Sequence, residues 1–316
     1  MNKADYKYVY GPVPSRRLGR SLGIDLAPFK ICTYDCIYCQ LGRTTNKTME
    51  RREYSPFESI LKELNRKLKE GASPDYISLA GSGEPTLNAC TGKLIREIKN
   101  LTSIPVAVIT NGSLLWMKEV QEELEPADVI MPSLDAGDDE IFQIVNRPHP
   151  DISFEKMTEG LVKFRERFHK PVWLEVFLLP NISGRESEVK KIAAIVHRIR
   201  PDKVQLNSIA RPPAEKYASR MPDDSMESCA RLFDVETEVI SERRKNNTPP
   251  ISASVTDDDV VALLSRRPCT ARGVTLGLGI NLNETVKIIQ KLCEQGAIKE
   301  TRNDKDIFYE TIRKTE

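Results

Sequence analysis

Short apolar runs alternate with amphipathic helical segments from residue 21 to residue 210. In segment 55–71, Phe57, Ile60, Leu61 and Leu64 fall on one face of a helix, which Gly71 ends. The expected strands are 21–28, 75–83, 104–112, 128–135, 171–180 and 202–210. The expected helices are 55–71, 89–101, 114–124 and 185–199, with helical stretches across 138–168. Such repeats predict an α/β fold, a partial (β/α)6 TIM-like barrel whose parallel strands are covered by helices.

Polar or small residues follow the strands at the ends where a barrel carries its functional groups. The segments are GSGEP, TNGS, SLD, LPNIS and NSIARPP, each after a different strand. Residues of these types also mark ordinary turns. Five such loops at one rim nevertheless favour a functional site there.

The pattern changes after the last of these strands. Residues 222–246 have a helical and charged pattern, and KNNTPPISASV (245–255) is typical of a linker. A short helix over 257–268, a helix and turn over 270–280 and a helix from 281 that Gly296 ends, followed by two short strands within 298–310, predict a winged-helix module. We therefore expect a barrel domain with a basic N-terminal extension over 1–247 and a small winged-helix-like domain over 248–316.

Composition is that of an ordinary globular protein, with 40% hydrophobic and 29% charged residues and a net charge of +1. No apolar run approaches the roughly 20 residues that span a membrane. The N-terminal stretch lacks the apolar core of a signal peptide. We expect a cytoplasmic protein with no membrane partner. In a reducing compartment, clustered thiols serve metal binding or catalysis more often than disulfides.

Three cysteines fall within eight residues, in CTYDCIYC: Cys32, Cys36 and Cys39. A zinc site would want a fourth ligand, and no second CxxC pair or matching histidine is present. A redox CxxC would leave Cys32 unexplained. An iron–sulfur cluster is held by closely spaced thiolates, and three ligands for four irons leave one iron open to a small molecule. Of the other cysteines, Cys90 lies soon after GSGEP, and a role for it in catalysis is left open.

The CxxxCxxC spacing, with Tyr38 before the last cysteine and a strand before the first, resembles the signature of the radical S-adenosylmethionine (radical SAM) superfamily. The resemblance covers about residues 20–210. It implies that Cys32, Cys36 and Cys39 ligate three irons of a [4Fe–4S] cluster and that the amino and carboxylate groups of S-adenosylmethionine chelate the fourth. One-electron reduction would then release a 5′-deoxyadenosyl radical.

The same resemblance assigns further residues to the cofactor. Tyr38 would lie near the adenine, Gly81, Ser82 and Gly83 would offer backbone carbonyls to the methionine ammonium, and Glu84 would support that contact. The remaining expected cofactor residues are Thr110, Asn111, Ser133, Asp135, Asn207 and Ser208.

Positive charge is concentrated around the cysteine motif. Residues 1–52 hold ten Lys and Arg against four Asp and Glu, whereas residues 248–316 hold ten of each. The basic region suggests an acidic electron donor of the flavodoxin or ferredoxin type, or a phosphate-bearing substrate. Arg16, Arg17, Arg20 and Arg147 are candidate substrate residues. The balanced tail is unlike a dedicated DNA-binding domain, which favours a docking role.

Two functions follow from these patterns. The first is a radical SAM enzyme of the Fe–S oxidoreductase or transferase kind that modifies a macromolecule, either tRNA or a protein or peptide. SGEPTL and the general layout resemble the wyosine-type tRNA-modifying branch, although the chain lacks the N-terminal cysteines of a second cluster. The alternative is a cluster-bearing redox sensor that binds DNA through the winged helix.

Overall fold

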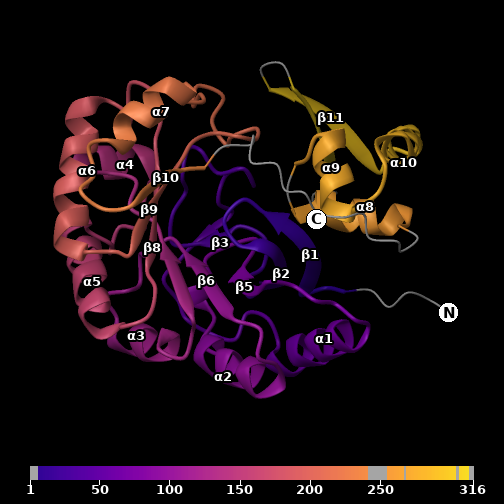
Figure 1. The fold of residues 1–316 in the computed structure, drawn as a ribbon, viewed down its shortest axis with the longest axis horizontal. Coiled ribbons are helices and arrows are strands. Elements are labelled where there is room, and N and C mark those ends of the chain that lie inside the picture. The colour runs from indigo at the N-terminus through magenta and orange to yellow at the C-terminus, as the bar shows by residue number, and fades with distance from the viewer. Residues whose placement is uncertain (1–5, 241–254, 267, 304–305, 313–316) are drawn as a thin grey trace.

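The protein is described by a computed structural model that covers residues 6–240, 255–266, 268–303 and 306–312. One sheet has the order β1-β2-β5-β6-β7 and a second has the order β10-β9-β8. The single bridges Ile130–Val172 and Ser133–Glu175 join β7 to β8, so the two sheets form one curved wall (Figure 1). The strands of this wall are β1 (Val9–Ser15), β2 (Gly19–Asp25), β5 (Tyr76–Ala80), β6 (Val106–Thr110), β7 (Val129–Pro132), β8 (Trp173–Phe177), β9 (Lys203–Asn207) and β10 (Thr237–Val239).

Strands β2 and β5 to β10 pair in parallel, and only β1 is antiparallel to its neighbour β2. Within the described residues, β1 and β10 end the strand order without pairing with each other. The wall is therefore an incomplete barrel, and the predicted partial α/β barrel is confirmed.

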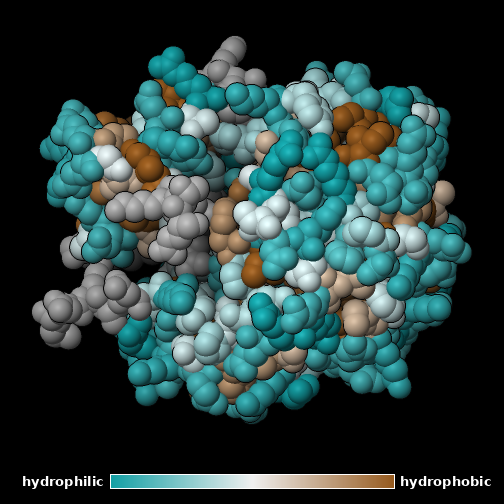
Figure 2. All heavy atoms as spheres, turned by 180° about the vertical axis from the view of Figure 1, so that it is seen from behind, coloured by the Kyte–Doolittle hydropathy of each residue, from teal (hydrophilic) through white to brown (hydrophobic). Residues whose placement is uncertain are grey.

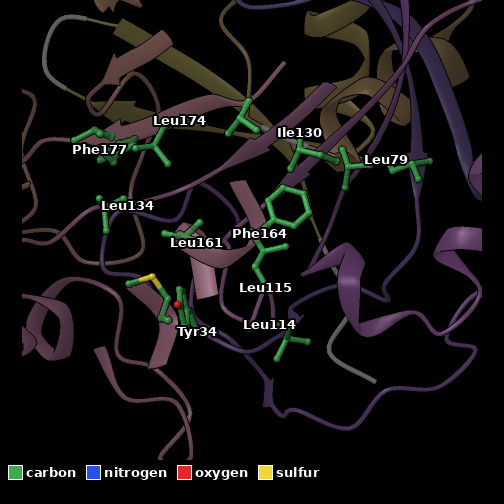
Figure 3. Packing of buried hydrophobic residues seen from close by; sticks show 14 of the residues in the cluster. Tyr34, Leu79, Leu114, Leu115, Ile130, Leu134, Leu161, Phe164, Leu174 and Phe177 are labelled. Atoms are coloured by element: carbon green, nitrogen blue, oxygen red, sulfur yellow. The ribbon is translucent and has the colours of Figure 1, made fainter. Parts of the chain in front are cut away.

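Helices cover the outer face of the wall (Figure 1). They are α1 (Phe57–Lys69), α2 (Thr91–Leu101), α3 (Lys118–Leu124), α4 (Asp139–Val145), α5 (Phe154–Arg167), α6 (Glu186–Ile199) and α7 (Asp223–Ala230). Figure 3 shows Phe164 of α5 beside Ile130 of β7, and both are almost fully buried. The large core lies between helices and strands because each strand sends alternate side chains outward.

The inner face of the wall changes from apolar to polar along the strands. Leu18, Ala107, Val129 and Met131 form a small apolar cluster. Further toward the carboxyl ends, the inner positions carry Ser78 (β5), Ser133 (after β7), Glu175 (β8) and Asn207 (β9), which line a common cavity. Since polar groups are costly to bury in a purely structural core, this end of the barrel is built to hold something polar.

Two parts of the barrel region differ from the sequence prediction. Residues 9–15 form β1, a strand that we did not predict. The helical prediction for 222–246 is wrong beyond α7, because Thr237–Val239 forms β10 beside β9 and residues 241–246 lie outside the described part. Without β10, the edge of β9 would leave backbone groups unpaired, and the β-branched Thr237 and Val239 suit a strand there.

The tail folds around its own small core. It consists of α8 (Asp257–Arg266), α9 (Ala271–Leu278), α10 (Leu282–Glu294), β11 (Ile298–Asn303) and β12 (Asp306–Thr311). Val260, Leu264, Val274, Ile289 and Leu292 are among its buried residues, and Val13 of β1 packs against them. This element order is the one expected from the sequence. The expected boundary at 247/248 and nearly all of the linker 245–255 lie outside the described residues.

The surface is mainly hydrophilic in the view of Figure 2, with smaller hydrophobic patches. On the tail, Leu276, Leu282 and Val286 are exposed apolar side chains. In the described part of the chain, no helix has both the length and the apolar character needed to cross a membrane.

Candidate active site

The cysteine loop is anchored by the residues between its thiols. Two short strands, β3 (Ile31–Cys32) and β4 (Asn46–Lys47), pair in parallel, and the Cys39 amide donates to the Cys36 carbonyl at 3.1 Å. Tyr34 and Ile37 are buried in the large core. The three cysteines remain half-buried and line the cavity instead. The alternation of core residues and cysteines therefore aims all three thiols into one space.

That space is a cavity of about 410 Å³ at the carboxyl end of the barrel. It is lined by all three cysteines and by every expected cofactor residue except Asp135. The lining residues that sequence analysis predicted for the cluster or the cofactor are Cys32, Cys36, Cys39, Tyr38, Gly81, Ser82, Gly83, Glu84, Thr110, Asn111, Ser133, Asn207 and Ser208. Residues from Cys32 to Ser208 in the sequence therefore converge on one site.

The donor set in the cavity fits an iron–sulfur cluster. Among the described residues, no three His, Cys, Asp or Glu groups are arranged to hold a single metal ion. A mononuclear zinc site is thus disfavoured, whereas a cluster is several ångströms across and takes its thiolates from separate corners. Burial raises the pKa of Cys32 to about 12, with a further contribution from Glu84. A cysteine binds a metal as the thiolate, so the thiol proton must leave. A bound metal centre causes this deprotonation outright.

Each thiol also receives one side-chain hydrogen bond. Lys30 Nζ lies 3.1 Å from Cys39 Sγ, Asn111 Nδ2 lies 3.5 Å from Cys32 Sγ, and Asn146 Nδ2 lies 3.5 Å from Cys36 Sγ. Sequence analysis missed Lys30 and Asn146 as site residues. The position of Lys30, two residues before the first cysteine, was the available signal.

The GSGE loop is held by two buried carboxylates. Asp25, at the end of β2, accepts hydrogen bonds from Ser82 N at 3.0 Å and Ser82 Oγ at 2.6 Å. Only glycine fits at position 83, where a Cβ would lie 2.0 Å from the carbonyl oxygen of Ile31. Gly81 has φ of +137°, and its Cβ would lie 2.3 Å from Asp25. The GSGE loop therefore lies closer to Ile31, the residue before Cys32, than a side chain at position 83 would allow.

Glu84 fastens this loop to the end of β6. It is 2% exposed and accepts hydrogen bonds from Thr86 N, Thr86 Oγ1, Thr110 Oγ1 and Asn111 N at 2.6–3.0 Å. Burial raises the pKa of Glu84, and these hydrogen bonds oppose the shift. Both carboxylate oxygens are occupied, so the residue positions its neighbours.

Asp135 lies behind Tyr38 and not on the cavity wall. The Tyr38 hydroxyl donates to Asp135 at 2.5 Å, and its ring stacks on Phe177 with centroids 3.8 Å apart. Asn146 Nδ2 and the Phe177 amide also donate to Asp135. Burial raises the pKa of Asp135, against these hydrogen bonds. Asp135 thus fixes the tyrosine that faces the cavity.

The candidate substrate arginines separate into two groups. Arg16 and Arg17 line the cavity, and Arg17 forms an ion pair with Glu175, a residue that sequence analysis missed. Burial lowers the pKa of Arg17 to about 10, and Arg16 contributes. The structure does not bring Arg20 or Arg147 to the cavity wall.

Arg147 and the neighbouring basic residues have other partners. The guanidinium of Arg147 donates to Glu215 at 2.7 Å and to the Tyr217 hydroxyl at 2.9 Å. Arg43 pairs with Glu215, and Arg51 pairs with Glu123. Two of the ten basic residues of the N-terminal region, Arg43 and Arg51, therefore already have acidic partners.

Cys90 is half-buried before α2 and does not line the cavity.

Glu175 and Leu263 both line the cavity, but only the position of Glu175 could have been predicted from the sequence. Glu175 is a charged residue inside the apolar run WLEVF, and its inward position on β8 was readable from strand alternation. Leu263 of α8 also lines the cavity. Nothing in the sequence indicates that the tail contributes to this wall, because the contact depends on how the tail packs on β1.

Comparison with known proteins agrees with this fold and with the family that the cysteine motif resembles. The family model described as the Radical SAM superfamily matches residues 26–193. The chain belongs to the radical SAM superfamily and is an enzyme of that class. Members of this superfamily bind a [4Fe–4S] cluster and S-adenosylmethionine and depend on an external reductant.

Two relatives match almost the whole of this chain. The UPF0026 protein MJ1312 of Methanocaldococcus jannaschii is 33% identical over 309 residues, which are 95% of this chain and 94% of that protein. A protein named GTPase Obg from Brachyspira hyodysenteriae is 40% identical over 305 residues, and the match covers 95% of this chain but 44% of that protein.

A solved structure gives the same fold. A radical SAM methyltransferase from Sphaerobacter thermophilus has a TM-score of 0.54 at 16% identity, over 69% of this chain and 65% of that chain. At this identity the likeness concerns the fold alone.

Proposed function

We propose that Cys32, Cys36 and Cys39 hold the cluster in the 410 Å³ cavity and that the enzyme uses it with S-adenosylmethionine to modify a macromolecule, tRNA or a protein or peptide. When bound, the two cofactors supply a 5′-deoxyadenosyl radical by one-electron reductive cleavage. The observation that carries the proposal is the convergence of three thiols and ten expected cofactor residues on one cavity.

The residues around the thiols have complementary roles. Tyr38, held by Asp135 and Phe177, offers a fixed aromatic surface for the adenine. The tight Gly81–Glu84 loop brings backbone groups to the methionine end, and Asp25 and Glu84 hold it there. Ser133, Asn207 and Ser208 offer polar groups for the ribose and adenine. These residues bind, orient and shield the cofactor, and none has to act as an acid or base in the cleavage step.

The part of the cavity wall that carries Ser21, Ser78, Arg17 and Glu175, called here the barrel floor, favours a polar reacting group. Ser21 and Ser78 share a hydrogen bond of 2.7 Å, and Arg17 and Glu175 form an ion pair. A macromolecular substrate would present one residue or base to this floor. Arg16 and Arg211 at the cavity wall would contact phosphates or acidic side chains outside it.

We assign residues 1–247 to the catalytic barrel and residues 248–316 to a winged-helix-like domain that docks the substrate. Leu263 reaches the cavity from α8, and Leu276, Leu282 and Val286 are exposed on the same module. The balanced charge of the tail favours docking over DNA binding. A DNA-binding redox regulator is not supported, because the family is one of enzymes.

An acidic protein of the flavodoxin or ferredoxin type is the proposed electron donor, and the cytoplasm is the proposed location. The positive charge of residues 1–52 surrounds the cysteine loop and would attract such a donor. Salt would then slow electron delivery, because attraction between exposed charges is screened.

Iron content tests the ligand assignment. After anaerobic reconstitution, we expect Cys36→Ala to lose the cluster and its brown absorbance while the far-ultraviolet circular dichroism is kept. Cys90→Ala is the matched control, since Cys90 lies outside the cavity, and it should retain wild-type iron. Full iron in Cys36→Ala, or equal loss in both variants, would refute the assignment.

The substrate class is tested separately. Reconstituted enzyme is incubated with dithionite and S-adenosylmethionine, alone, with total tRNA, or with a cell-protein fraction freed of RNA. A macromolecular substrate should raise 5′-deoxyadenosine formation in one of the two supplemented samples and acquire a mass change. Stimulation only by the small-molecule filtrate of the same cells would contradict the macromolecular proposal.

A further inference from the structure

Lys30 occupies an unusual position for a lysine. Its residue is 4% exposed, and its φ of +58° lies in the left-handed region. The Lys30 amide donates to the Ser82 carbonyl at 2.6 Å, and the Lys30 carbonyl accepts from the amides of Thr45 and Asn46 at 3.2 Å. Its backbone is thus fixed where the cysteine loop meets the GSGE loop. A lysine is rarely buried in this way without a charged or polar partner.

The partner is a cysteine thiol. Lys30 Nζ lies 3.1 Å from Cys39 Sγ and lines the cavity. Asn111 and Asn146 donate to the other two thiols, each at 3.5 Å. Of these three donors, only Lys30 carries a charge. The Asn111 amide also donates to Thr33 Oγ1 at 2.7 Å, and the Asn146 amide donates to Asp135 at 2.8 Å.

Two buried carboxylates lie close behind the other two thiols. Glu84 accepts from the backbone amide of Asn111, and the Asn111 side chain donates to Cys32. Asp135 accepts from Asn146 Nδ2, which also donates to Cys36. A reduced cluster carries one more negative charge than an oxidised one. Two buried carboxylates therefore oppose reduction, and the Lys30 ammonium favours it.

We propose that Lys30 is a positioning and redox-tuning residue that raises the reduction potential of the cluster by donating to the Cys39 thiolate. Hydrogen bonds to ligand sulfurs and net charge around a cluster are established determinants of its potential. The inference rests on the proposed cluster site. Lys30 would thereby make the transfer of one electron from a ferredoxin- or flavodoxin-type reductant to the bound cluster more favourable.

The experiment measures the midpoint potential of the cluster and does not depend on enzyme turnover. Wild-type, Lys30→Met and Lys30→Arg holoproteins are reconstituted anaerobically, iron and sulfide are counted, and the midpoint potential is obtained by dye-mediated titration followed by electron paramagnetic resonance. Lys47→Met is the matched control. Lys47 lies in β4, which pairs with the strand that holds Cys32, and its replacement by Met removes the same charge. Its Nζ, however, donates to the carbonyls of Arg147 and Pro148 at 3.2 and 3.0 Å.

We expect Lys30→Met to shift the midpoint potential to a more negative value, Lys30→Arg to restore most of the shift, and Lys47→Met to match the wild type. Asn146→Leu should give a smaller negative shift, because it removes a neutral donor. If Lys30→Met does not retain its iron, Lys30→Leu gives the same comparison, since it also removes both the charge and the N–H donor.

The outcomes separate the two proposals. A wild-type protein that takes up no cluster overturns both. A loaded Lys30→Met or Lys30→Leu protein with the wild-type potential overturns the role of Lys30 alone. Equal shifts in Lys30→Met and Lys47→Met would also overturn it, because the effect would then be one of general charge and not of the hydrogen bond to Cys39.

Discussion

Replacement of Glu84 tests how the cofactor loop is held. Glu84→Gln leaves one acceptor oxygen for four donors, and the new NH₂ group faces at least one of them. The Thr86 and Thr110 hydroxyls can rotate toward other acceptors, whereas the amides of Thr86 and Asn111 are fixed by the backbone. A buried donor without a partner costs about 1–3 kcal/mol.

We therefore expect Glu84→Gln to lower the free energy of unfolding of the cluster-free protein by about 1–3 kcal/mol, for one unpaired amide. Glu84→Ala leaves both amides unpaired, and we expect a loss of about 2–6 kcal/mol, reduced by relief of the buried charge. Urea denaturation followed by circular dichroism gives both values, with the exposed Glu58→Gln of α1 as a control.

The contribution of Glu84 to the free energy of unfolding changes with pH in a direction that follows from its pKa shift. Burial raises the pKa of Glu84 above its ordinary value of 4.5, so the folded protein binds this proton more tightly than the unfolded chain. The stability that protonation contributes is present below the unfolded pKa and is lost as pH rises through the folded pKa. The wild type should therefore gain stability relative to Glu84→Gln as the pH falls from neutral toward 4.5. A Glu84→Ala protein within about 0.5 kcal/mol of the wild type, the range of surface substitutions, would refute this reasoning.

Three further predictions concern neighbouring parts of the site. Gly83→Ala should abolish binding of S-adenosylmethionine in equilibrium dialysis, because its Cβ would lie 2.0 Å from the Ile31 carbonyl, whereas Gly273→Ala in α9 should bind normally. Arg17→Met should lower the free energy of unfolding by about 3 kcal/mol by leaving Glu175 buried and unpaired, and adding Glu175→Leu should recover most of the loss; no recovery in the double variant would contradict the pairing. Tyr38→Phe should cost about 1–2 kcal/mol by removing a donor to the charged Asp135, measured by urea denaturation, and an unchanged unfolding midpoint would argue against this hydrogen bond.

The order of strands and helices in the barrel was predictable because each strand corresponds to an apolar run in the sequence and each helix to an amphipathic segment. The site was predictable where a motif and a strand end coincide, as at Cys32–Cys39 and Gly81–Glu84. Strand β10 was missed because its three residues depend on the free edge of β9 and carry little pattern of their own. Strand β1 was missed because VYGPVPS contains a glycine and two prolines, which obscure the alternation.

Roles that depend on distance could not be read from the sequence. Asp135 was expected to contact the cofactor, but it lies behind Tyr38, and strand position alone does not distinguish these places. Arg147 follows α4 in a loop with the composition of a binding loop, yet its guanidinium bonds to Glu215, which lies 68 positions away. Lys30 was counted only as one of ten basic residues, because its hydrogen bond to Cys39 depends on its left-handed backbone.

Formation of 5′-deoxyadenosine tests the central claim most directly. The anaerobically reconstituted enzyme is reduced with dithionite in the presence of S-adenosylmethionine, and the product is quantified by liquid chromatography and mass spectrometry. The structure predicts 5′-deoxyadenosine from the wild type and none from Cys36→Ala. A wild-type protein with an intact cluster and bound S-adenosylmethionine that forms none would contradict the account.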